Sequence, residues 1–82
     1  MRIVGIEERT GEFEGRSYRF FNLHCLSDDD RMIGQRVERV KVPGAVFDAW
    51  EKQCGCPRDG LLSVDVDFNY DRWNRVKSIV EL

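Results

Sequence analysis

Residues 11–25, GEFEGRSYRFFNLHC, join a glycine-punctuated turn to a strand whose side chains alternate between two faces. Glycine tolerates the positive φ angles of tight turns, so the two glycines predict a hairpin loop within residues 10–15. The strand is predicted over residues 17–25, and its core face carries Phe21, Leu23 and Cys25. The outer face then carries Tyr18, Phe20, Asn22 and His24.

Strand patterns also lie on both sides of this stretch. Residues 2–8 form a β-branched run that leads into the hairpin loop. After a charged loop, residues 35–42 alternate again. Arg39 and Lys41 share the face opposite Val40, so this third strand presents a basic stripe.

A short helix follows the third strand. Pro43 suits a first helical turn, and apolar residues recur at helical spacing until Gly55 and Pro57 end the helix. Trp50 lies on the apolar face, so we expect it in the core.

Two strands close the chain. Residues 62–70 alternate as a half-buried strand, and residues 69–74 supply a turn. The last strand is predicted over residues 75–82. Its alternation places Val76, Val80 and Leu82 on one face and Lys77, Ile79 and Glu81 on the other.

The order of these elements decides the predicted fold. Three strands, one short helix and two strands predict an all-β chain with the topology of the OB-fold, a closed five-stranded Greek-key barrel in the order β-β-β-α-β-β. An SH3-like barrel and an open α+β sheet use the same elements. No linker or repeat divides the chain, so residues 1–82 are expected to form a single OB-like domain.

Composition narrows the class of protein. The chain has 82 residues, of which 41% are hydrophobic and 34% charged, so its core is small and a homodimer would add stability. It shows no apolar signal-peptide core and no membrane-spanning stretch, which favours a cytoplasmic protein without a membrane partner. Three cysteines cannot all pair within one chain, so reduced thiols are expected. The net charge of −2 means that any phosphate site needs local segregation of charge.

Aromatic and basic residues gather where an OB barrel binds ligands, on the second and third strands and the two loops beside them. Rings stack on unpaired bases while Arg and Lys follow the phosphate backbone. The predicted nucleic-acid-binding residues are Phe13, Arg16, Tyr18, Phe20, Arg39, Lys41, Arg72, Trp73 and Arg75. Packing of Trp73 against the barrel is an equally good interpretation of that residue.

Catalysis and metal binding find little support. His24 lies on the strand face opposite Cys25, so it cannot act as the base for that thiol. Cys54 and Cys56 lack the C-x-x-C spacing of a zinc knuckle, and Asp65 with Asp67 fits solvent-exposed alternation. We therefore expect no enzyme activity, no metal and no cofactor.

The layout resembles the small OB-fold helix-destabilising proteins of phages and mobile elements. The resemblance rests on the hairpin GEFEGRSYRFFNLHC and on the closing hairpin YDRWNRVKSIVEL at residues 70–82. It implies a dimer that coats single-stranded DNA without sequence preference during DNA replication, with Arg16, Tyr18 and Phe20 in the binding site. The acidic net charge departs from the basic surface of that family.

Two functions follow as hypotheses. The first is non-sequence-specific binding of single-stranded DNA, with RNA as a further ligand that the residues do not separate from DNA. The alternative is a protein-protein interaction or assembly module that uses the same aromatic and basic face.

Overall fold

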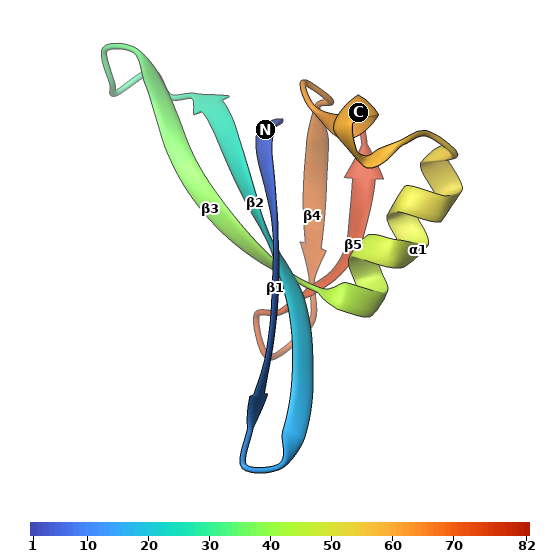
Figure 1. Cartoon of the computed structure of the whole chain (residues 1–82). Coiled ribbons are helices and arrows are strands. Elements are labelled where there is room, and N and C mark those ends of the chain that lie inside the picture. The colour runs from blue at the N-terminus through green and yellow to red at the C-terminus, as the bar shows by residue number, and fades with distance from the viewer.

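The computed structural model describes the whole chain from Met1 to Leu82 (Figure 1). In chain order the elements are β1 (Arg2–Phe13), β2 (Arg16–Asp28), β3 (Gln35–Pro43), α1 (Gly44–Cys54), a 3-10 helix (Arg58–Leu61), β4 (Val66–Tyr70) and β5 (Val76–Glu81). The chain is therefore mostly β with one short α-helix, as its patterns predict. No helix is long and apolar enough to cross a membrane.

The five strands form two antiparallel sheets. β1, β2 and β3 make one sheet in that order, and β4 pairs with β5 in the other. The start of β1 joins the sheets, because the Ile3 N–H donates to the Val64 carbonyl (3.0 Å) and the Val66 N–H donates to the Met1 carbonyl (2.8 Å). No ladder connects β3 to β5, although these strands are neighbours. The prediction of a closed barrel is therefore wrong, because β1 meets the β4 region only through an isolated bridge and β3 and β5 share no ladder.

The helix α1 packs on strands of both sheets. It contacts β2 and β3 of the first sheet and β5 of the second. The rings of Phe21 and Phe47 stack with their centroids 3.9 Å apart, and Trp50 meets Phe47 edge-on at 5.9 Å. Packing of large rings thus ties α1 to the first sheet.

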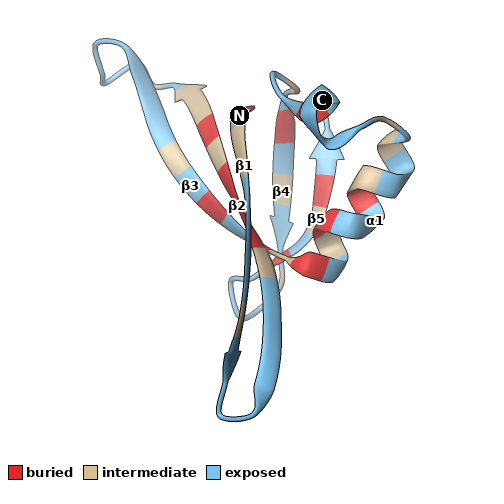
Figure 2. Ribbon diagram, viewed as in Figure 1, coloured by how far each residue is buried: buried red, intermediate tan, exposed pale blue.

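The core lies between the two sheets and α1, where Figure 2 shows the buried positions in red. Phe21, Leu23 and Cys25 have no exposed surface, which confirms the predicted inner face of β2. Trp50 is also in the core, with 4% of its surface exposed. The predicted helix is confirmed, and Gly55 ends it with a φ of 68°.

The hairpin between β1 and β2 is longer than its glycines predict. β1 continues to Phe13, and the turn consists of Glu14 and Gly15, which both have positive φ. Gly11 lies inside the strand, opposite Tyr18. The predicted hairpin is confirmed and its turn lies within residues 10–15, but residues 10–13 belong to β1, because Gly11 makes room for a tyrosine ring instead of a turn.

The last two strands are shorter than predicted. The 3-10 helix and the positive φ of Ser63 interrupt the chain, so β4 begins only at Val66. A register shift between Asn69 and Tyr70 then changes the alternation of β5. Val76 and Ile79 are buried, whereas Val80 and Leu82 are exposed. The predicted alternation of β5, with Val76 and Ile79 on opposite faces, is therefore wrong, because both are buried.

Candidate nucleic-acid interface

The sheet β1–β2–β3 turns one face away from α1, and we call it the outer face. Strand pairing fixes its members, because residues directly opposite one another in a ladder share a face. It carries Glu7, Arg9, Gly11 and Phe13 of β1, Arg16, Tyr18, Phe20, Asn22 and His24 of β2, and Arg39 and Lys41 of β3. The six predicted site residues of the strands and first hairpin thus share one face.

Tyr18 and Phe20 form a two-ring platform at the centre of this face. Their ring centroids are 6.0 Å apart with an interplanar angle of 24°. The Tyr18 ring lies against Gly11, at the place where any larger residue would put its Cβ. Glycine therefore allows the ring to lie along the sheet, with 47% of the tyrosine exposed to a stacking partner.

Gly11→Ala is expected to move the Tyr18 ring and leave the fold intact. The new Cβ would overlap the ring, which can swing away because it is the free end of a side chain. We expect the free energy of unfolding to change by less than about 1 kcal/mol, since alanine also favours a strand over glycine. Urea titration measures the stability, and the ring protons of Tyr18 in NMR spectra report its position. Unchanged ring shifts would contradict this account of Gly11.

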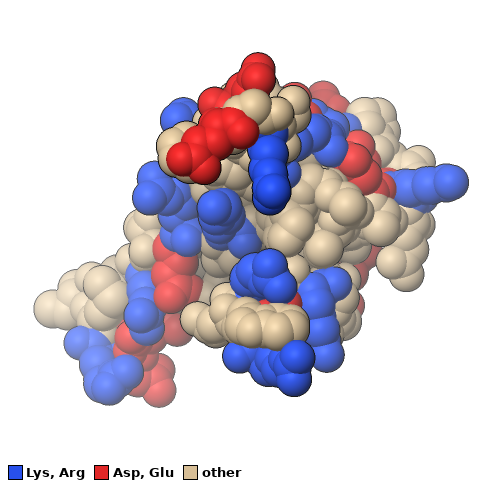
Figure 3. Space-filling view, turned by 90° about the horizontal axis from the view of Figure 1, so that it is seen from below, with Lys and Arg blue, Asp and Glu red and all other residues tan.

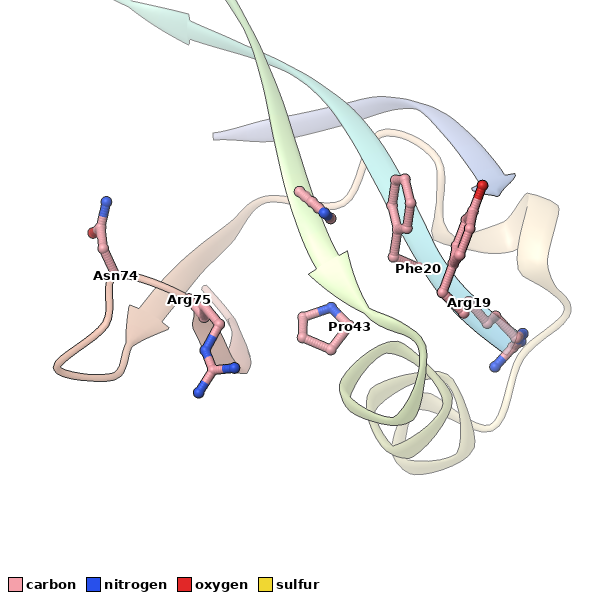
Figure 4. A pocket seen from close by; sticks show the side chains of 7 residues that line it. Arg19, Phe20, Pro43, Asn74 and Arg75 are labelled. Atoms are coloured by element: carbon pink, nitrogen blue, oxygen red, sulfur yellow. The ribbon is translucent and has the colours of Figure 1, made fainter. Parts of the chain in front are cut away.

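A groove runs beside the platform. Its volume is about 340 Å³, and its lining comes from β2, from the end of β3 and from the β4–β5 loop. Lys41 holds its ammonium 4.4 Å from the Phe20 ring centroid. Figure 4 shows Phe20 on one side of the groove, with Asn74 and Arg75 coming from the loop on the other side of Pro43. The groove thus brings together two rings and three cations, Arg19, Lys41 and Arg75, from three separate parts of the chain.

The β4–β5 loop is held in shape by Asp71. Its carboxylate accepts hydrogen bonds from the backbone N–H of Trp73 (2.9 Å) and of Arg75 (3.0 Å). These bonds present the Trp73 ring to solvent with 61% of the residue exposed, so Trp73 does not pack against the barrel. The guanidinium groups of Arg72 and Arg75 lie 4.3 and 5.1 Å from the indole centroid. The loop therefore offers a ring and two planar cations, all of which can stack on bases.

The order of this loop is expected to depend on pH. The backbone hydrogen bond from Arg75 is the main cause that lowers the pKa of Asp71 below its usual value of 3.8. A carboxyl with a lowered pKa stabilises the folded loop above pH 3.8, and this contribution is lost as the pH falls through the lower folded value. The amide proton shifts of Trp73 and Arg75 should titrate together with a midpoint below 3.8. A midpoint at or above that value would contradict the role given to Asp71.

Most cations of the site have no carboxylate partner. The predicted phosphate contacts that form no ion pair are Arg16, Arg39, Lys41 and Arg72. Arg75 pairs with Asp71 at 3.3 Å. Figure 3 shows Lys and Arg side chains gathered around one projection at the lower centre of that view. Unpaired cations attract phosphate without first giving up a salt bridge, so a chain of negative net charge still has a locally basic surface.

Arg19, which lies between Tyr18 and Phe20 in the sequence, differs from these unpaired cations because it is bound to carboxylates. It donates to Glu8 (2.8 Å) and, from a second nitrogen, to Asp48 of α1 (2.9 Å). This bidentate contact lowers the pKa of Asp48. Arg19 thus fastens the hairpin to the helix and is already occupied by carboxylates.

The remaining predicted residues lie at the end of the hairpin. Phe13 and Arg16 pair across the ladder next to the turn, and 69% of Phe13 is exposed. They extend the outer face along the projecting hairpin (Figure 1), but they do not line the groove. Sequence reasoning missed Pro43 and Asn74, which do line it. The positive φ of Asn74 is typical of a turn residue, and nothing in its local sequence indicates contact with β3.

The thiols and paired carboxylates lie outside this site. Cys25 is buried in the core, which raises its pKa, while Cys54 and Cys56 are half-buried free thiols. No group of three His, Cys, Asp or Glu side chains is placed to hold a metal ion. Asp65 and Asp67 are both exposed.

Comparisons of the chain with models of protein families, with curated proteins and with solved structures find no match. The functional conclusion therefore depends on the outer face, its groove and the β4–β5 loop.

Proposed function

We propose that this protein binds single-stranded DNA without strict sequence preference. The observation that carries the proposal is the shared location of exposed rings and unpaired cations. Tyr18 and Phe20 lie on the outer face beside Lys41, and the loop with Trp73 borders the same groove. This combination suits an unpaired strand, because bases stack on the rings while the phosphates meet the cations.

The fold supports the same proposal. An OB-fold is a partly open five-stranded barrel that binds oligonucleotides on strands two and three and on the loops after strands one and four. Here β3, β2 and β1 form one ladder series and β4 pairs with β5, while an isolated bridge and a few backbone hydrogen bonds join the start of β1 to the segment before β4, and β3 lies beside β5 without a ladder. We interpret this arrangement as OB-like. The candidate interface then occupies the surface that OB domains use for ligands.

Titration with oligo-dT tests the proposal, with intrinsic tryptophan emission as the signal. Trp73 is exposed and Trp50 is buried, so quenching on binding reports mainly on Trp73. If the site contacts ~3–5 phosphates, log affinity should fall with log salt with a slope of about −2 to −3.5. Absence of binding at low salt would reject the proposal and favour a protein-protein interface.

A pair of lysine variants locates the contacts. Lys41 and Lys77 are both exposed strand residues without a carboxylate partner, but Lys77 lines a groove beside α1, away from the outer face. Lys41→Gln should make the salt slope shallower by about 0.7, the value for one phosphate contact with a single strand. Lys77→Gln should leave it unchanged. Equal effects of the two variants would mean that the attraction is not confined to the outer face.

A further inference from the structure

One carboxylate lies among the cations and rings of the outer face. Glu7 stands directly opposite Asn22, two positions along the ladder from Arg9 and Phe20, so the two pairs are neighbours on the same face. The other acidic residues of the β1 arm, Glu8 and Glu12, point to the opposite face of the sheet. A negative charge here repels phosphate. Its position beside the ring platform therefore favours a hydrogen-bond donor of the ligand over a phosphate.

Glu7 and Asn22 form a fixed pair. The Asn22 amide nitrogen donates to a Glu7 carboxylate oxygen at 3.1 Å, and Asn22 itself is only 9% exposed. The second carboxylate oxygen lies 3.6 Å from Arg9. The hydrogen bond from Asn22 lowers the pKa of Glu7, which keeps the group ionised near neutral pH.

The pair presents acceptors to the ligand. The Asn22 carboxamide oxygen accepts no hydrogen bond from the protein, yet it is not sealed from solvent. The Glu7 carboxylate also keeps acceptor capacity, since 45% of its side chain is exposed. Two hydrogen-bond acceptors beside a ring that can stack on a base are suited to a base edge that carries a hydrogen-bond donor.

Bases differ in what they offer at that edge. Cytosine carries an amino group at the position where thymine carries a carbonyl oxygen, and adenine also carries an amino group. In a single strand these edges are free of pairing and accessible to side chains. A carboxylate accepts from the cytosine amino group, whereas it repels the thymine oxygen.

We infer that Glu7 and Asn22 select bases with an exocyclic amino group when a base stacks beside Phe20. This specificity rests on the proposed binding of single-stranded DNA and refines it. Stacking and phosphate contacts accept every base. The acceptor pair adds a preference for a base with an exocyclic amino group at one position per protein chain.

Oligo-dC and oligo-dT of equal length test the inference, since the two pyrimidines have rings of the same size. The native protein should bind oligo-dC about 10- to 150-fold more tightly than oligo-dT at the same salt concentration, as one charge-assisted hydrogen bond provides. Glu7→Gln keeps an oxygen for the Asn22 amide and removes the charge. It should strengthen binding of oligo-dT and bring the ratio of the two affinities close to one.

Glu12→Gln is the matched control, because Glu12 is an exposed residue of the same strand on the opposite face. It removes the same charge and should leave the ratio of affinities as in the native protein. A native protein that binds both oligonucleotides equally would overturn the inference while leaving the proposed function in place. So would a Glu7→Gln variant that changes both affinities by the same factor. Failure to bind either oligonucleotide would overturn both.

Discussion

Replacing Tyr18 with leucine is expected to weaken binding of oligo-dT about 5- to 150-fold, because each stacked base contributes ~1–3 kcal/mol. Leucine keeps an apolar side chain over Gly11 but offers no planar ring to a base. The variant should fold normally, since Tyr18 is exposed on the hairpin. Fluorescence titration at low salt measures the loss.

Tyr18→Phe is the control for this prediction. It retains the ring beside Phe20 and removes only the hydroxyl group, so its affinity should stay close to that of the native protein. A leucine variant that binds as well as the phenylalanine variant would show that Tyr18 does not stack on bases. Equal losses in both variants would instead assign the effect to the hydroxyl group.

Phe47→Ala is expected to remove about 3–5 kcal/mol from the free energy of unfolding, the usual cost of deleting a buried phenylalanine ring. Phe47 has no exposed surface and stacks on Phe21 in the core. A domain of this size has a total stability of only about 4–12 kcal/mol. The variant should therefore be largely unfolded at moderate urea concentrations that leave the native protein folded.

Phe13→Ala provides the comparison, because this phenylalanine is mostly exposed at the hairpin end. Its free energy of unfolding should change by no more than about 0.5 kcal/mol. Urea titrations followed by circular dichroism measure both variants. Similar losses for the two would contradict the assignment of Phe47 to the core.

Local sequence patterns predicted which helices and strands form better than they predicted the residues at which these elements begin and end. The alternation in β2 and the helical spacing around Trp50 reflect burial on one face, and burial produced both patterns. The extent of β1 was not predictable from its own residues, because Gly11 fits a turn as well as a strand. Only the tyrosine across the ladder decides between them.

The same distinction applies to β5 and to its position beside β3. Val80 alternates with Val76 in sequence, but the register shift between Asn69 and Tyr70 exposes it. The packing of β3 beside β5 without a ladder is a relation between segments far apart in the chain. Neither the shift nor the packing leaves a local signal in the sequence.

Only part of the candidate site was likewise predictable from the sequence. Alternation alone predicted that Tyr18 and Phe20 share an outer face with Lys41. The approach of the β4–β5 loop to β3 is a long-range contact, so Asn74 could not be placed in the groove beforehand. The carboxylate of Glu7 was likewise visible only once the ladder set it opposite Asn22.

Mapping by NMR tests the central claim most directly. Addition of oligo-dT to isotopically labelled protein should shift the amide signals of Tyr18, Phe20, Lys41, Trp73 and Arg75, whereas the signals of α1 should stay in place. Shifts confined to α1 and the groove beside Lys77, or scattered evenly over the molecule, would contradict the account of a single binding face.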